Sequence, residues 1–456
     1  MLSSKHITKI SIVLISLALA LCIFAMVFYD SLQATFGGSV YNMEYEQKLF
    51  DTDVIMSVDI KMDEAKWDKM LENPMAEEYY QCDVTVNGKT FYGVGIRPKG
   101  NTSLSSIAND PDNNRYSFKL EFDQFTEGQT CFGLDKLVLN NNFADTTNMK
   151  EAIVYDMYKF LGADAPLYNY AKISVNGQYW GVYLALEAVE ESFMLRNYGT
   201  EKGYLYKPDN MGFGRDEKGG GGFGRGGSNL NYTNSNPDNY SSIWNSAVNE
   251  STETDHQRVV EALKNISERN NVEKYADVDN ILKYMAVHNF VVNDDSLSGF
   301  MAHNYYLYEA NGRLNIIPWD YNLSFGSMGM GGGSATTVIN EPIDDSYQST
   351  DFFDFVLDND ELKEKYHQYY SKLVEEYVYG GKLDRTRERI MSQIDELVKT
   401  DPNAMYTYDE YQKGAQVLYD VIMLRAKSVR DSLMVQYHKL PRDKRKIQQP
   451  LLTHLT

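Results

Sequence analysis

The sequence predicts an α+β fold in which a strand-rich first half precedes a helix-rich second half. Helical periodicity dominates residues 255–293 and 359–437. Three Asn-Gly pairs each lie between two segments of alternating polarity, and this pattern is typical of β-hairpins: Asn87-Gly88, Asn176-Gly177 and Asn311-Gly312. A chain of 456 residues is long enough for two or three domains. We expect two lobes of one folded unit, at about 54–187 and 230–437.

The first lobe is predicted to be an antiparallel sheet with one long helix inserted. Alternation of apolar and polar residues predicts strands at 54–62, 82–86, 90–96, 117–122, 136–139, 170–175 and 179–186. Helical spacing predicts helices at 63–71, 147–161 and 189–197, and Gly162 stands where the second of these should end. In the second lobe, 303–308 and 313–317 are the strands of the third hairpin.

Several segments are predicted to lie outside the packed core. Residues 31–53 are expected to be a polar tether, and residues 438–456 a loose basic tail. The glycine-rich segment 211–228 buries too little apolar surface to order itself, so we expect a loop. A phosphate-binding loop there would need a preceding strand and a following helix with Lys-Ser/Thr, and neither is present.

The amino terminus carries an apolar segment from Ile10 to Tyr29, twenty residues without a charge. A helix of that length covers ~30 Å, the hydrocarbon thickness of a bilayer. Lys5 and Lys9 precede it, so residues 1–30 are predicted to be a single-pass membrane anchor with the rest of the chain outside the cytoplasm. A cleaved signal peptide is the alternative, but the segment is long for one and lacks a small-residue cleavage site.

Composition excludes several classes of protein. Lys and Arg number 44 against 64 Asp and Glu, and a net charge of −20 disfavours nucleic-acid binding. Three cysteines are too few for a disulfide scaffold, and Cys82 and Cys131 are either one disulfide or two buried thiols. The seven histidines lack HExxH spacing, and no G-x-S-x-G elbow is present.

The most informative segment for chemistry is 289–326. It reads as a helix end, an acidic loop with Asp294 and Asp295, a hairpin preceded by Asn304, and then Asp320 directly after a strand. Acids on loops at strand ends are held by the scaffold while staying open to a ligand. A carboxylate at the edge of a core also needs a counterion, a helix amino terminus or a metal.

Several motifs in the same order resemble the spore-coat-H (CotH) kinases: GVGIRPKGNTS at 93–103, FKLEF at 118–122, LVLNN at 137–141, NGQYWGVYLALEAVE at 176–190, and HNYYLYE with IIPWDYNLSFG within 303–326. The resemblance covers about residues 54–435, although the HRD and DFG motifs of ordinary kinases are missing. It implies an atypical, two-lobed protein-kinase-like fold. It also implies transfer of phosphate from ATP, with Mg²⁺ or Mn²⁺, to Ser/Thr of a protein acceptor whose identity the sequence leaves open.

The resemblance also implies roles for residues of the second lobe. Asp295 would be the catalytic aspartate, although the adjacent Asp294 stays an alternative. Asp320 would be a metal ligand. Asn304 would be a second one, although it lies nine residues after Asp295 rather than the roughly five of ordinary kinases.

In the first lobe, phosphates need a cation and an acid that holds it. Lys119 on a strand followed by Glu151 on a helix has the order found in kinases. A solvated strand face is the alternative for Lys119, and Arg97 and Lys99 are alternative phosphate ligands from a closing turn. Glu187 falls near where a nucleotide-binding hinge would run, or it caps a helix.

These observations predict a membrane-anchored phosphotransferase that faces out of the cell. Transfer of a nucleotidyl group would need the same acids and metal, so it stays open. The alternative from another class is a cell-surface or envelope-associated binding module that keeps the fold without turnover. An acid pair flanking a hairpin favours the enzyme.

Overall fold

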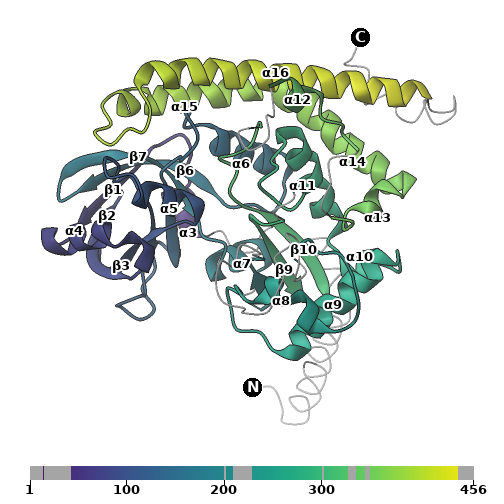
Figure 1. Ribbon diagram of the computed structural model, residues 1–456, viewed down its shortest axis with the longest axis horizontal. Coiled ribbons are helices and arrows are strands. Elements are labelled where there is room, and N and C mark those ends of the chain that lie inside the picture. The colour runs from purple at the N-terminus through teal and green to yellow at the C-terminus, as the bar shows by residue number, and fades with distance from the viewer. Residues whose placement is uncertain are drawn as a thin grey trace, which may run out of the picture.

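The computed structural model describes residue 14 and residues 43–199, 202–208, 228–299, 302–326, 335–344 and 350–439. It has an α+β architecture, with a strand-rich part at the left of Figure 1 and a helix-rich part that continues to the right and over the top. The strands are β1 (Met56–Lys61), β2 (Tyr80–Val86), β3 (Lys89–Lys99), β4 (Ser117–Glu121), β5 (Lys136–Asn140), β6 (Tyr168–Val175), β7 (Gln178–Glu187), β8 (Tyr204–Tyr206), β9 (Tyr305–Ala310) and β10 (Arg313–Pro318).

The α-helices are α3 (Glu44–Lys48), α4 (Glu64–Glu72), α5 (Thr102–Ala108), α6 (Lys150–Leu161), α7 (Glu191–Tyr198), α8 (Ser241–Trp244), α9 (Glu253–Ser267), α10 (Val272–Tyr275), α11 (Val278–Val291), α12 (Ala335–Asn340), α13 (Asp354–Leu357), α14 (Asp360–Lys372), α15 (Lys382–Lys399) and α16 (Tyr408–Lys439). Two short 3-10 segments, η1 (Pro74–Ala76) and η2 (Pro237–Tyr240), and a π-helical segment, η3 (Leu373–Val378), complete the elements.

The first seven strands form a closed barrel in the order β1-β2-β3-β4-β5-β7-β6. Neighbouring strands are antiparallel except β1 and β6, which pair in parallel with Val58 opposite Ile173. The predicted antiparallel sheet is therefore corrected to a barrel with one parallel pair. Alternation marks which side chains face inward, such as the buried Phe118 and Leu120 of β4, but it does not say which strands are neighbours.

The folded part begins before the first predicted strand. Helix α3 buries Tyr45, and Leu49 and Phe50 behind it join the barrel core. Asn169 of β6 donates hydrogen bonds to the backbone oxygens of Leu49, at 2.8 Å, and Val54, at 2.9 Å. The end of the expected tether, residues 31–53, is thus packed against the barrel from residue 44 onward.

The helix-rich part surrounds a small sheet of order β10-β9-β8. The predicted hairpin around Asn311-Gly312 is β9 and β10, and the three-residue β8 adds an unpredicted third strand. Helix α11, almost wholly buried, packs on this sheet, on α6 and on α14. Helix α16 runs over the top of Figure 1 beside α15. It continues to Lys439, so any tail starts after the predicted residue 438.

Several predictions fall on residues outside the described part. The apolar segment 10–29 does, apart from Leu14, and so do nearly all of 211–228 and residues 440–456. Within the described residues, no helix is both long and apolar enough to cross a membrane. Cys82 and Cys131 are separate buried thiols, which settles the alternative against a disulfide. Burial raises the pKa of the Cys82 thiol to about 12.

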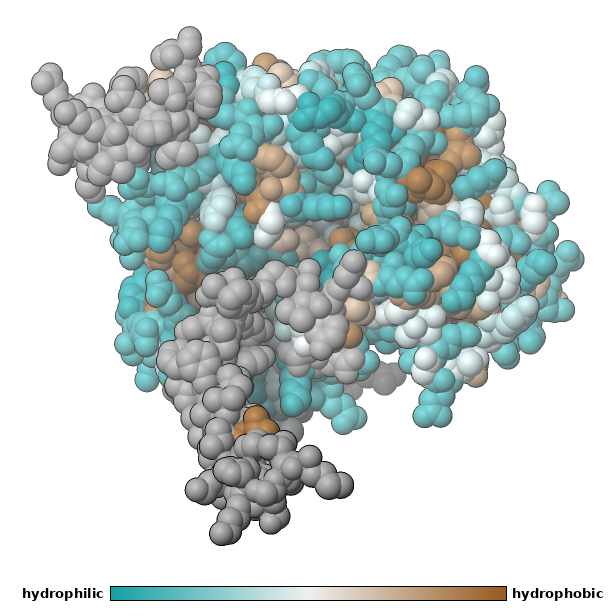
Figure 2. Space-filling model, turned by 180° about the vertical axis from the view of Figure 1, so that it is seen from behind, coloured by the Kyte–Doolittle hydropathy of each residue, from teal (hydrophilic) through white to brown (hydrophobic). Residues whose placement is uncertain are grey.

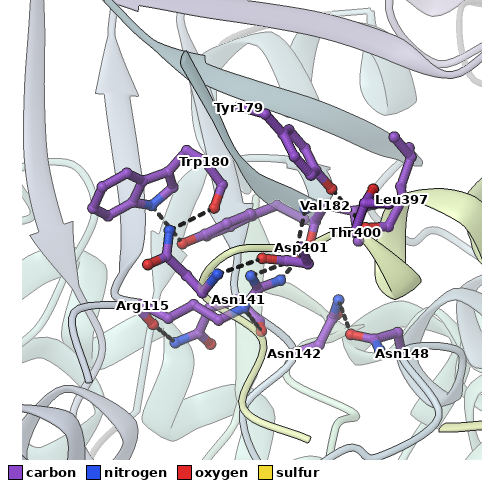
Figure 3. Close-up of polar contacts among 12 residues, drawn as sticks. Arg115, Asn141, Asn142, Asn148, Tyr179, Trp180, Val182, Leu397, Thr400 and Asp401 are labelled. Carbon is purple, nitrogen blue, oxygen red and sulfur yellow. Dashed lines mark hydrogen bonds and ion pairs between the residues drawn. The ribbon is translucent and has the colours of Figure 1, made fainter. Parts of the chain in front are cut away.

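A buried ion pair joins the barrel to the turn between α15 and α16 (Figure 3). The Arg115 guanidinium donates to Asp401 Oδ2 at 2.6 Å, and the two side chains are 3% and 2% exposed. The same carboxylate oxygen accepts from the backbone N–H of Val182 in β7, at 3.1 Å. Gly181 permits this approach, because a Cβ there would lie 2.5 Å from the guanidinium. We call this group the Arg115–Asp401 brace.

The surface seen from behind in Figure 2 is mostly hydrophilic, with apolar residues in small, separate patches. This agrees with the excess of 20 negative charges in the chain. The apolar side chains gather instead in two buried clusters, one inside the barrel and one in the helix-rich part.

Candidate active site

Charged side chains from both parts of the fold meet between the barrel and the helix-rich part. Lys99 ends β3, and its Nζ donates to Asn140 Oδ1 at 3.3 Å. Asn140 ends β5 and donates to Glu151 Oε2 of α6 at 2.9 Å. The other carboxylate oxygen of Glu151 accepts from the backbone N–H of Tyr321, at 3.4 Å, directly after Asp320. A chain of contacts thus links Lys99 to the end of β10.

Electrostatic effects extend this group to a third acid. Burial, followed by the charge of Asp320, raises the pKa of Glu151 to about 7. The same two causes, in the same order, raise the pKa of Asp295 to about 7. Burial lowers the pKa of Lys99, while Asp320 and Glu151 oppose that effect. We call Lys99, Glu151, Asp295 and Asp320 the acid–lysine cluster.

The carboxylate of Asp295 is held from two sides. His303 Nε2 lies 3.2 Å from Oδ1, and the Asn304 amide donates to Oδ2 at 3.0 Å. The same amide donates to the backbone oxygen of Asp295 at 2.9 Å. The pKa of Asp294 is raised by partial desolvation alone and not by Asp320, so of the two neighbours it is Asp295 that interacts with Asp320. His303 was not predicted, and its place immediately before Asn304 was the available signal.

The backbone around these acids is strained. Asp320 has φ +62°, Asn304 +55° and Val292 +48°, all in the left-handed region that residues with a Cβ seldom occupy. Such residues cluster where the surrounding fold imposes a special geometry, and functional loops are a common case. Gly299 is also required, because a Cβ there would lie 1.7 Å from the Asp294 carbonyl oxygen.

Lys119 does not reach Glu151, which corrects the expected pairing. It forms an ion pair with Glu190 at the start of α7, and Lys136 of β5 pairs with the same carboxylate. The outward face of β4 lies opposite α7, whereas Glu151 is approached from the ends of β3 and β5. The lysine beside Glu151 is therefore Lys99, which the sequence offered only as an alternative.

Arg97 and Glu187 have other partners. Arg97 forms an ion pair with Glu77 and lies 5.3 Å above the ring of Tyr79. Glu187 is fully buried, and its carboxylate accepts from Tyr45 Oη at 2.6 Å and from Arg196 Nη2 at 2.6 Å. These contacts fasten α3 and α7 to β7, so the carboxylate of Glu187 faces neither the acid–lysine cluster nor a helix amino terminus.

Two aromatic rings border the acid–lysine cluster. Lys99 Nζ lies 5.7 Å from the centre of the Trp319 ring, which meets Tyr306 edge to face at 5.4 Å. A second lysine, Lys207 after β8, lies 6.0 Å from Trp319 and 5.8 Å from Tyr306. Cations and aromatic faces attract one another at such distances. The sequence gave no signal for Lys207, since β8 itself is only three residues long.

The oxygens at this site fit a hard divalent cation. No three His, Cys, Asp or Glu side chains of the described residues lie close enough together to form a metal centre of their own. Mg²⁺ is commonly held by one or two side-chain oxygens, with phosphates and water completing its shell. The Asp320 carboxylate and the amide oxygen of Asn304 supply oxygens of that kind, because the Asn304 nitrogen is already directed at Asp295.

Comparisons with known proteins identify the family of this chain. The model of the family described as CotH kinase protein matches residues 96–429, which include every member of the acid–lysine cluster. The inner spore coat protein H of Bacillus subtilis (strain 168) is 22% identical over 321 residues, or 68% of this chain and 82% of that protein. The family match alone covers well over half of the chain. The chain belongs to the CotH kinase family.

Proposed function

We propose that this chain is a phosphotransferase that transfers the terminal phosphoryl group of ATP to a Ser/Thr hydroxyl of a protein. Membership of a kinase family implies the use of ATP. The observation that supports the finer proposal is the acid–lysine cluster. Asp320 acts on Glu151, Asp295 and Lys99, so the acids of the cluster lie near one another; a divalent cation would balance their charge, and Lys99 would bind the phosphates.

Each residue of the acid–lysine cluster has a role in the proposal. Lys99 binds phosphate oxygens, and Glu151 holds Lys99 in place through Asn140. Asp295 receives the acceptor hydroxyl and takes up its proton, while His303 and Asn304 fix the orientation of its carboxylate. Lys119 of β4 and Arg97 of β3 lie opposite one another on adjacent strands, and they extend the positively charged surface of the site toward Glu190.

Asp320 and Asn304 would hold Mg²⁺ or Mn²⁺, which supplies charge neutralisation of the phosphates. A carboxylate can approach phosphates only with a cation between them, because both are negative. The contribution of the chain's own acids is to orient the acceptor hydroxyl, to accept its proton and to keep Lys99 in position.

The direct test incubates the full chain with γ-labelled or α-labelled ATP, Mg²⁺ or Mn²⁺, and a mixed protein acceptor. Incorporation of the γ label into Ser/Thr supports the proposal. Incorporation of the α label instead means nucleotidyl transfer. If neither label is incorporated and metal–ATP does not bind, a surface-binding module without turnover becomes the better description.

Substitution of the two acids separates their roles. Asp320→Asn should abolish metal-dependent ATP binding and turnover together. Asp295→Asn should keep ATP binding and lower turnover by ~10²-fold or more, the scale for loss of a positioned acid–base group. The matched control is Asp294→Asn, a neighbouring exposed acid that should leave turnover within about twofold. Calorimetric titration with ATP and thermal melting tell the outcomes apart, and unfolding of both variants would make the two acids structural.

We also propose that the chain is a single-pass membrane protein with the folded part outside the cytoplasm. The uncharged segment 10–29 behind Lys5 and Lys9 supports this orientation. Protease added to intact cells should then degrade the folded part, and the mature chain should keep its first residues. Recovery of a soluble form that starts after residue 30 would mean a cleaved signal peptide.

A further inference from the structure

A histidine with no place in the proposed chemistry lies at the centre of a buried hydrogen-bonded chain. His288 of α11 is 1% exposed. Its Nδ1 lies 3.1 Å from Tyr321 Oη, and its Nε2 lies 2.5 Å from Ser298 Oγ. Tyr321 Oη is in turn 2.6 Å from Tyr158 Oη of α6. We call Tyr158, Tyr321, His288 and Ser298 the buried relay.

Three members of the buried relay lie on segments that also carry an acid of the candidate site. Tyr321 directly follows Asp320, and Ser298 lies three residues after Asp295. Tyr158 lies seven residues after Glu151 on α6, which is two helical turns, so both side chains share one face of that helix. The segments that carry Glu151, Asp295 and Asp320 are therefore linked to one another through the buried relay.

Ring packing holds the same residues. Tyr284 stacks on His288 with ring centres 5.2 Å apart and on Tyr158 at 6.1 Å. The Tyr321 ring meets Tyr158 edge to face at 5.6 Å. The hydroxyl of Tyr284 also approaches Ser296 Oγ at 3.5 Å, on the same loop as Ser298. The hydrogen-bonding groups are thus fixed in place by their rings.

Burial keeps the ring of His288 neutral, because it lowers the pKa to about 3. A neutral imidazole has one N–H and one acceptor nitrogen, so it can bond two hydroxyls only as donor to one and acceptor from the other. The hydrogen bonds must therefore run in one direction through the buried relay. Loss of the hydroxyl at one end of the buried relay therefore alters the hydrogen bonds available at the other end.

From this geometry we propose that the buried relay positions the loops of Asp295 and Asp320 relative to α6, so that its members are positioning residues for phosphotransfer. The proposal rests on the proposed function of the acid–lysine cluster. Partners behind the groups that hold a metal or a substrate commonly change activity by about 10–100-fold when removed, without touching either.

The test compares Tyr158→Phe with Tyr377→Phe in the full chain. Both tyrosines are fully buried, and each has a hydroxyl whose bond Phe would delete, but Tyr377 donates to Asp156 on another side of α6, at 2.9 Å. Two quantities are measured: amide hydrogen exchange of residues 293–299 without ligands, and kcat and KM for ATP. Phe keeps the ring that stacks on Tyr284, so Tyr158→Phe acts through the hydroxyl, which bonds to Tyr321 and through it is linked to His288 and Ser298.

We expect Tyr158→Phe to speed exchange in residues 293–299 by about fivefold or more and to lower kcat by about tenfold, with KM for ATP within about threefold. Tyr377→Phe should change neither the exchange of these residues nor kcat, even where it lowers thermal stability as much as Tyr158→Phe does. As a second variant, Ser298→Ala removes the hydroxyl at the other end of the buried relay and should speed hydrogen exchange in residues 319–326.

Equal hydrogen exchange of residues 293–299 in the Tyr158→Phe and Tyr377→Phe variants overturns the proposal. If the wild type transfers no phosphate, the proposed function fails, and the exchange data still decide whether the buried relay couples the loops.

Discussion

The Arg115–Asp401 brace and the acid–lysine cluster are both groups of charges inside the fold, but the brace is buried whereas Lys99, Asp295 and Asp320 are half-buried, and the two groups are built differently. In the brace one cation meets one anion, and backbone N–H and C=O groups take up further bonds of both. In the acid–lysine cluster the charge of Asp320 acts on Glu151, Asp295 and Lys99, and the carboxyls of Glu151 and Asp295 have raised pKa values. A complete set of partners indicates a structural role, whereas acids that raise one another's pKa indicate a place for a cation.

The largest effect should come from breaking the brace. Arg115→Ala leaves the Asp401 carboxylate buried without its cation, and removal of one partner of a buried ion pair costs about 3–5 kcal/mol. Chemical denaturation should show this loss. Arg115→Met with Asp401→Asn removes both charges and should be more stable than Arg115→Ala. If the single variant loses less than about 1 kcal/mol, the brace is not a determinant of stability.

A smaller but more specific effect should come from the two lysines. Lys99→Met keeps the side-chain length near Trp319 but removes the cation beside Glu151, so phosphotransfer should fall by ~10²-fold. Lys119→Met is the matched control, because Lys119 pairs with Glu190 at the edge of the site, and we expect a loss below about tenfold. Initial rates at several ATP concentrations check this. If Lys119→Met loses more activity than Lys99→Met, then Lys119 is the lysine that binds the phosphates.

The smallest effect is a pH dependence of stability. In the folded protein the pKa of Glu151 is about 7, against an ordinary value of 4.5. Between these values the folded protein keeps a proton that the unfolded chain has lost, so stability falls as pH rises through 7. Without divalent cations, wild type should lose about 1 kcal/mol between pH 6 and pH 8 relative to Glu151→Gln. Parallel stability curves for the two proteins would contradict the raised pKa.

Local signals in the sequence were sufficient for the hairpins and for α6. An Asn-Gly pair requires only its neighbours to form a turn, and Gly162 ends α6 with φ +71° as predicted. The parallel pairing of β1 with β6 and the packing of α3 against the barrel depend on contacts distant in the sequence, so periodicity did not reveal them.

The same distinction applies to the candidate site. Asp295, Asn304 and Asp320 became candidates because the order of motifs in the sequence resembles that of the family, and the structure brings Asn304 to Asp295. The lysine was assigned to Lys119 because strand order alone does not give the direction of a side chain around a closed barrel. Lys99 and Arg97 lie on the same face of β3, two residues apart, yet only Lys99 reaches Asn140.

The closed barrel also has a consequence for how the protein can be shortened. The family match starts at residue 96, within β3, whereas closure needs β1, β2 and the first half of β3. A fragment cut at residue 96 would keep the pairing of β3 with β4, but it would leave β6 without its partner β1 and would uncover the apolar interior. Exposed strand edges of this kind recruit other chains, so the fragment should sediment as aggregates. A fragment that starts at residue 43 keeps the barrel closed and should remain monodisperse.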